Sequence, residues 1–213
     1  MASRYDPDRL RAVQRYAVLS DDAQPALDRI VRLACRCTHA SAALLSLVDA
    51  DTTTLLAHTG LSRRTASAYA TRPFTPHVLD TDAVLVVPDL LSDARFAEHP
   101  FVTGAPCVRT YAAAAVTATD GSVLGALELL HTTPDAVGTA DTDVLRDLAA
   151  LASHELSHHV LPHAHADILE SISDAFFALD TEWHFTYVNE RAEQLLDRPR
   201  RELIDRNVWE AFP

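Results

Sequence analysis

The strongest constraint on the fold of this chain is a long hairpin pattern in residues 110–131. Two apolar, strand-like runs, residues 110–118 and 123–131, are separated by Asp120-Gly121, a dipeptide typical of a type I′ hairpin turn. The first run holds four consecutive alanines, Ala112 to Ala115, which leave space for a helix to pack closely over one face. The pattern therefore predicts an antiparallel sheet with a helix against it.

Helices are predicted on both sides of this hairpin in the sequence. Apolar positions that recur at spacings of three and four predict helices over residues 6–18, 22–38 and 139–161. We expect Pro162 to end the last of them, because a proline inside a helix removes a backbone hydrogen bond.

Shorter apolar runs predict the remaining strands over residues 42–48, 52–58 and 83–87, the first two as a second hairpin. Residues 61–82 are irregular, with two prolines that exclude a long helix, and residues 92–106 form a loop around a short helical turn. Strands bracketed by helices indicate the α+β class, with an antiparallel sheet flanked by helices.

The charge balance excludes several classes of function. The chain has 213 residues and a net charge of −12, and all 18 of its basic residues are arginine. No basic patch for nucleic acid or for an anionic membrane surface is expected, and lysine chemistry is excluded. No apolar run approaches the roughly 18 residues that span a bilayer, so we expect a soluble, cytoplasmic protein.

The three cysteines, Cys35, Cys37 and Cys107, do not indicate a disulfide framework. Cys35 and Cys37 lie two apart on a predicted helix, so their side chains point in different directions. We expect buried or half-buried free thiols.

Several short motifs occur in one order along the chain: residues 43–49 (ALLSLVD), 60–61 (GL), 86–89 (VVPD), 93–96 (DARF) and 120–127 (DGSVLGAL). In this order they resemble the GAF domain, a sensory module, over residues 10–160. Where related domains carry Ser-Phe-Cys before a histidine, residues 73–77 read PFTPH and lack the cysteine. Covalent chromophore attachment is therefore not expected. The cyclic-nucleotide signature and the cysteine pattern of the free methionine sulfoxide reductases are also missing.

The resemblance implies a ligand pocket between the sheet and its loops. The expected ligand-binding residues are Phe74, His77, Asp93, Arg95, Arg109 and Tyr111. The alternative is structural: Asp93, Arg95 and Arg109 would form an ion-pair network that fixes the loop, and the aromatic residues would belong to the core. The resemblance does not identify a cofactor.

Residues 168–213 resemble the first half of a PAS domain. Residues 173–180 and 183–189 correspond to its first two strands, and the short helices that follow correspond to residues 192–196, 201–204 and 207–209. We therefore expect a GAF-like domain over residues 1–161 and a linker with a partial PAS-like segment over residues 162–213. Two such strands alone would leave an open sheet edge, so we expect residues 168–213 to be cleaved by proteases more readily than residues 10–160.

Residues 154–158 (HELSH) match the HExxH pattern of zinc peptidases. On a helix, His154 and His158 share one face with Glu155 beside them, and His159, His163 or His165 could supply a third ligand. Five of the eleven histidines lie in residues 154–165, so a match to HExxH can arise there by chance. An apolar stripe at Leu145, Leu148, Ala152, Leu156 and Val160 leaves both histidines of the motif on the solvent side.

The function favoured by these observations is a non-enzymatic sensory module. It would bind a small ligand, or sense dimer geometry, and relay the signal along residues 141–161 to a downstream output, as in bacterial two-component histidine kinases. The apolar stripe would form a homodimer seam or would cover the domain's own sheet. Two alternatives stay open: a zinc-dependent hydrolase using HELSH, and a ligand-free dimerisation scaffold.

Overall fold

The computed structural model describes residues 5–17, 23–78, 84–171, 175–180, 182–204 and 206–212. The chain folds into two compact units, Met1–Val160 and Leu161–Pro213. No helix in the described ranges is long and apolar enough to cross a membrane.

The first unit is built on one five-stranded sheet with the order β2-β1-β5-β4-β3, in which every neighbouring pair is antiparallel. The strands are β1 (Ala42–Val48), β2 (Thr53–Thr59), β3 (Leu85–Val87), β4 (Thr110–Thr117) and β5 (Val123–His131). Both predicted hairpins are confirmed, as is the α+β class. The predicted strand over residues 83–87 is a short edge strand of which only Val87 is buried, and residue 83 lies outside the described residues.

The turn between β4 and β5 differs from the predicted type I′ turn. A type I′ turn needs a positive φ at both central residues, but here only Gly121 has one, at +85°. The Gly121 N–H donates to the Ala118 carbonyl at 3.0 Å, and the Ala118 N–H donates to the Ser122 carbonyl at 2.8 Å. The connection is therefore a three-residue loop with glycine in the left-handed position.

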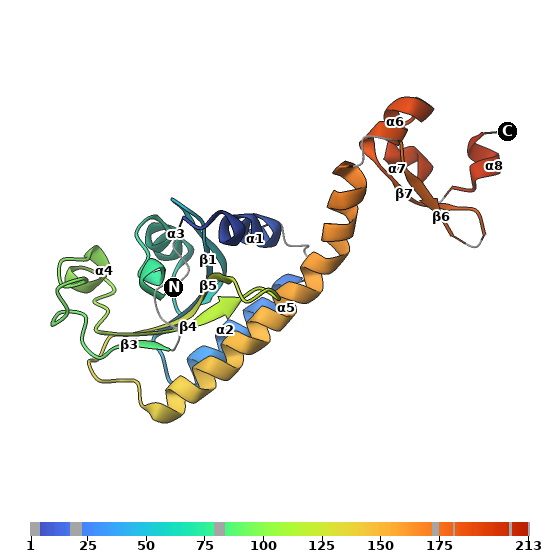
Figure 1. Cartoon of the computed structure of the whole chain (residues 1–213). Helices are drawn as coiled ribbons and strands as arrows, with labels where there is room; N and C mark the ends of the chain where they lie inside the picture. The colour runs from blue at the N-terminus through green and yellow to red at the C-terminus, as the bar shows by residue number, and fades with distance from the viewer. Residues whose placement is uncertain are drawn as a thin grey trace. The chain divides into compact units, whose positions relative to one another are not determined.

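Three helices cover one face of this sheet, which we call the helix face: α1 (Pro7–Ala17), α2 (Gln24–Cys37) and α5 (Thr139–Ser171). Figure 1 shows α5 running along the sheet on the same side as α2. Ala112 and Ala114 of β4 share a buried cluster with Leu145 and Ala149 of α5, as the run of alanines predicted. The hydroxyl of Ser153 also accepts a hydrogen bond from the Thr117 N–H at 2.9 Å.

The apolar stripe of α5 belongs to this same core. Leu145, Ala152 and Leu156 are fully buried against the sheet, and Leu148 is packed beside them, while the side chain of Val160 lies outside the described part of the chain. Of the two roles considered for the stripe, the structure shows the second, covering the domain's own sheet. A dimer formed through this helix would have to use its outward residues.

The end of α5 was predicted wrongly. The helix does not stop before Pro162 but continues to Ser171, through the stretch we expected to be a linker. A proline inside a helix removes one backbone hydrogen bond and bends the axis locally, so it destabilises the helix without necessarily ending it.

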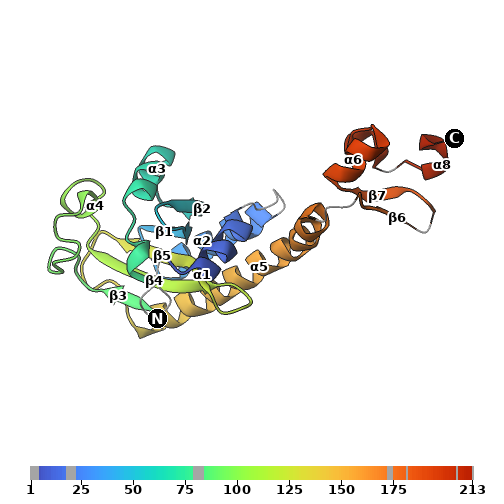
Figure 2. The same cartoon turned by 45° about the horizontal axis from the view of Figure 1, so that its top comes forward.

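The opposite face of the sheet, which we call the loop face, is covered by shorter elements: α3 (Arg63–Thr71), the 3-10 helix Thr75–Val78, and α4 (Pro100–Thr103). Figure 2 shows α3 and α4 apart from α5. The nine-residue helix α3 was not predicted. Its start is set by Ser62, whose hydroxyl accepts from the Thr65 N–H at 3.1 Å, a capping arrangement.

The second unit contains the antiparallel pair β6 (Phe177–Leu179) and β7 (Phe185–Val188), followed by α6 (Glu190–Leu196), α7 (Arg200–Leu203) and α8 (Val208–Ala211). This order of two strands and three short helices is the order predicted from the sequence. Asn189 begins α6, because its side-chain oxygen accepts from the N–H groups of Phe176 and Ala192, both at 2.9 Å. A small core forms around Phe185 and Leu203.

Candidate functional site

Aromatic rings fill the space between the sheet and the loops on the loop face. Phe74 lies among them, with ring centroids 5.5 Å from Tyr69, 5.4 Å from Phe96 and 5.2 Å from Tyr111. Phe74 and Tyr111, two of the predicted ligand-binding residues, are both fully buried. The His77 ring packs against Phe96 at 4.7 Å. These predicted residues therefore do meet on one face, Phe74 and Tyr111 within its packed interior and His77 half-buried beside Phe96.

The most unusual group in this interior is the carboxylate of Glu128, which the sequence analysis did not single out. Glu128 lies in the middle of β5 and is fully buried. One carboxylate oxygen accepts from Ser46 at 2.6 Å and from Thr75 at 2.9 Å. The other accepts from the phenol of Tyr69 at 2.6 Å and of Tyr111 at 2.9 Å. Four hydroxyls from four separate elements thus converge on one carboxylate.

Burial governs the electrostatics of this cluster, which we call the Glu128 cluster: Ser46, Tyr69, Thr75, Tyr111 and Glu128. Burial raises the pKa of Glu128, while the hydrogen bonds donated to its charged form act in the opposite direction. Burial, reinforced by the nearby Glu128 charge, also raises the pKa of Tyr69 and Tyr111. Within the described ranges no arginine or histidine forms an ion pair with Glu128.

The charged residues predicted for the site lie at the rim of the loop face and pair differently from the expectation. Arg95 pairs with Asp93 at 2.6 Å, and Arg109 forms a two-pronged pair with Asp89 at 2.9 and 2.8 Å. The expected single network is therefore two separate ion pairs, and Asp89, which the sequence analysis passed over, is the partner of Arg109. An open depression of about 490 Å³ lies beside them, lined by Val87, Pro88, Asp89, Ser92, Asp93 and Ala94.

Replacing Asp89 by asparagine is expected to make the first unit less sensitive to acid. The hydrogen bonds from Arg109 lower the pKa of Asp89 to about 2. A carboxylate with a lowered pKa contributes stability above its unfolded value near 3.9, and that contribution is lost as the pH falls toward 2. The stability gap between wild type and Asp89→Asn should therefore close between about pH 4 and about pH 2.

This prediction is checked by urea unfolding of both proteins across that pH range. Asp143→Asn is the matched control, because Asp143 also pairs with an arginine, Arg146 at 2.7 Å, but as an exposed pair one helical turn apart. A gap between wild type and Asp89→Asn that stays constant with pH would show that the Arg109 pair does not stabilise the fold.

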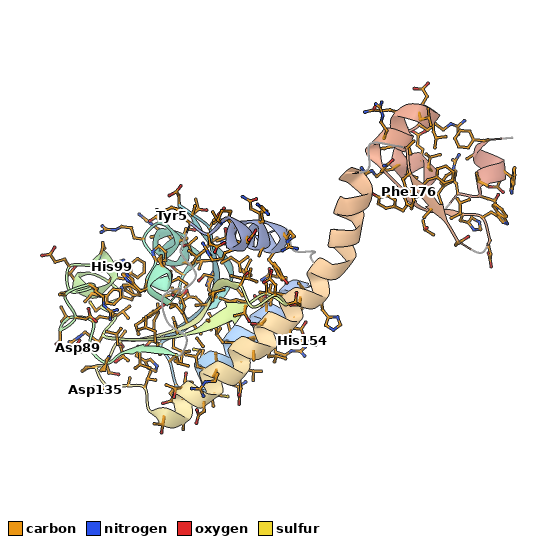
Figure 3. The ribbon with its side chains drawn as sticks, viewed as in Figure 1. Tyr5, Asp89, His99, Asp135, His154 and Phe176 are labelled. Carbon is orange, nitrogen blue, oxygen red and sulfur yellow. The ribbon has the colours of Figure 1, made fainter. Side chains whose placement is uncertain are left out.

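The HELSH motif lies on α5, away from the loop face. His154 and His158 are exposed, whereas Leu156 is buried in the helix-face core, so the expected placement of the two histidines is confirmed. Figure 3 shows the His154 side chain projecting away from the sheet. The described residues contain no group of three or more side chains suited to hold a metal ion. The side chains of His159, His163 and His165 lie outside the described part of the chain.

All three cysteines are free, as predicted, but their burial was predicted only in part. Cys35 is half-buried and donates to the Ala40 carbonyl at 3.0 Å, and burial raises the pKa of its thiol. Cys37 and Cys107 are exposed.

Two domain families match the sequence. A model of the GAF domain matches residues 22–156, and a model of the PAS domain matches residues 165–213. The two resemblances found in the sequence are thereby confirmed. A search of curated protein sequences finds no match.

Solved structures with similar folds cover most of the first unit. A domain assigned to a two-component sensor histidine kinase protein from Sinorhizobium meliloti has a TM-score of 0.56 at 14% identity, over 67% of this chain and 95% of its own. The GAF domain of a phosphoenolpyruvate-protein phosphotransferase from Acinetobacter has a TM-score of 0.52 at 21% identity, over 77% and 96%. A free methionine-R-sulfoxide reductase from Thermoplasma acidophilum has a TM-score of 0.53 at 10% identity, over 65% and 94%. At these identities the likeness shows the fold alone.

Proposed function

Because the GAF domain model matches more than half of its residues, the chain belongs to the GAF domain family, and we propose that it is a sensory input module whose loop face responds to a small molecule. The observation that carries this proposal is the Glu128 cluster. A buried carboxylate is costly to desolvate and is kept where a polar group is needed in the interior. The cluster is closed to solvent in this structure, so in this proposal the loop face opens to admit the ligand. A ligand that then exchanges hydrogen bonds with these hydroxyls would act on several elements at once.

The sheet offers a direct route from this cluster to α5. Along β4, the side chains of Tyr111 and Ala113 lie on the loop face, whereas those of Ala112 and Ala114 lie on the helix face. Because strand residues alternate between the two faces, a shift of β4 or β5 caused at Glu128 also moves residues that contact α5. The hydrogen bond between Thr117 and Ser153 ties the end of β4 to the same helix.

We propose that α5 carries the signal onward to an output in a two-component histidine kinase, in a cytoplasmic and dimeric protein. The PAS domain match that follows the GAF unit, and the kinase assignment of a structural neighbour, support this context. The dimer would use the outward face of α5, because its apolar stripe is buried in the domain's own core. In this proposal the GAF unit senses and transmits and has no catalytic role.

Native mass spectrometry of the purified chain, with a denatured control, tests the ligand proposal. We expect a released organic mass in wild type that is lost in Tyr111→Phe and Thr75→Val, which remove donors to Glu128 and leave the backbone intact. Ser62→Ala is the control, since its hydroxyl caps α3 without touching Glu128. A chain that carries no organic molecule, and that no member of a metabolite panel stabilises against heat, would favour the ligand-free scaffold.

A further inference from the structure

Two histidines lie one turn apart on the outward side of α5, outside the site described above. The ring centroids of His154 and His158 are 4.8 Å apart, with the rings nearly perpendicular. Residues four apart on a helix lie on the same face, and both side chains are exposed here. A metal ion from solution would therefore reach both rings.

The imidazole nitrogens of this pair are not used elsewhere in the described part of the chain. Neither His154 nor His158 has a hydrogen bond or an ion pair with any described residue. The nitrogens of both rings are therefore available to coordinate an ion.

The backbone beneath the pair is held in place by its opposite side. Ala152 precedes the pair and Leu156 lies between its two members, and both are fully buried in the helix-face core. Ser153 is tied to β4 through its hydrogen bond with Thr117. Ligands mounted on a packed helix keep their spacing, which lowers the entropy lost when a metal binds.

We propose that His154 and His158 form a chelating site for a divalent transition-metal ion of the class that prefers imidazole: zinc, nickel or copper. Neutral imidazole is a good ligand for these ions, whereas calcium and magnesium prefer oxygen. Two imidazoles leave further coordination positions, which water fills. The bound ion links successive turns of α5, the helix that leads out of the GAF unit.

The site is proposed as a two-histidine chelate and not as a peptidase centre. A catalytic zinc site takes three protein ligands and one open position. Within the described residues no third metal-binding side chain joins the pair. The inference is independent of the proposed ligand at the loop face, and its test does not depend on any activity.

The untagged chain is titrated with Zn²⁺ by calorimetry, and with Cu²⁺ for electron paramagnetic resonance, which counts the coordinated imidazole nitrogens. The test variant is the double substitution His154→Gln with His158→Gln. The matched control is His159→Gln with His163→Gln, which removes two histidines of the same spacing from the same helix.

We expect one Zn²⁺ site that survives in the control and is lost in the test variant, which keeps neither ligand. His154→Gln alone should weaken binding about a hundredfold, because the second of two linked ligands binds at high effective concentration. In the control protein, Cu²⁺ should show two imidazole nitrogens, and one after His154→Gln is added. A wild type that binds no ion, or a test variant with unchanged affinity and stoichiometry, would overturn the proposal.

Discussion

Replacing Glu128 by alanine is expected to lower the free energy of unfolding of the first unit by about 3–5 kcal/mol. The substitution takes the common acceptor away from four buried hydroxyls and leaves them in a site that water does not reach. An unsatisfied buried donor costs about 1–3 kcal/mol, and neighbouring donors recover part of this by pairing with one another. Urea unfolding followed by circular dichroism measures the loss.

Two gentler variants test this explanation of the loss. Glu128→Gln keeps the shape and one acceptor oxygen, so its loss should be smaller than that of Glu128→Ala. Tyr111→Phe removes a single hydrogen bond to a charged acceptor, worth about 1.5–3 kcal/mol. If Glu128→Ala were as stable as wild type, the cluster would not be what holds the elements covering the loop face to the sheet.

The same carboxylate should leave a signature in the pH dependence of stability. Its pKa is raised in the folded state, so between the unfolded and folded values the folded protein binds more protons than the unfolded one. The contribution of Glu128 to stability is thus fully present below its unfolded pKa near 4.3 and is lost as the pH rises through its folded pKa. As the pH is lowered toward the unfolded pKa, wild type should therefore gain stability relative to Glu128→Gln.

Local sequence patterns predicted the sheet of the first unit well. The two hairpins and the close approach of α5 follow from short apolar runs, turn residues and a run of alanines, all of which are visible within short stretches of sequence. The errors fall where the deciding contact is distant or the local signal is weak. Nothing periodic marks α3, whose buried side rests on Ala66 and Tyr69 only. Proline was given too much weight at residue 162, where the helix continues.

The candidate site was harder to predict, because its key group depends on strand register. Glu128 pairs with Leu44 of β1 and Ala113 of β4, and this pairing brings it close to Ser46 and Tyr111. One signal was present in the sequence: a single acidic residue inside the apolar run of residues 123–131. Motif resemblance instead selected residues outside β5, and it grouped Arg109 with Asp93, whereas the partner of Arg109 in the structure is Asp89.

The substitution Gly125→Ala is expected to disrupt the centre of the sheet. Gly125 lies in β5 between Leu47 of β1 and Val116 of β4. A Cβ added there would overlap the backbone oxygen of Ser46 and lie 2.8 Å from the Leu47 Cα. Both obstacles are backbone atoms of the adjoining strand, so no side-chain rotation relieves them. We expect the free energy of unfolding to fall by roughly 3 kcal/mol or more. The cost exceeds that of ordinary overpacking because here the backbone itself has to move.

Gly121→Ala is the matched control for this prediction, because it adds the same methyl group in the neighbouring turn. No atom lies within 4 Å of a Cβ at Gly121, but its φ of +85° disfavours a side chain. Its expected cost is only the conformational strain of about 1–2 kcal/mol. In thermal and urea unfolding, Gly125→Ala should therefore be much less stable than Gly121→Ala. The reverse order would mean that β1 and β5 separate more easily than their register implies, and the sheet could not then transmit a shift from Glu128 to α5 as a rigid layer.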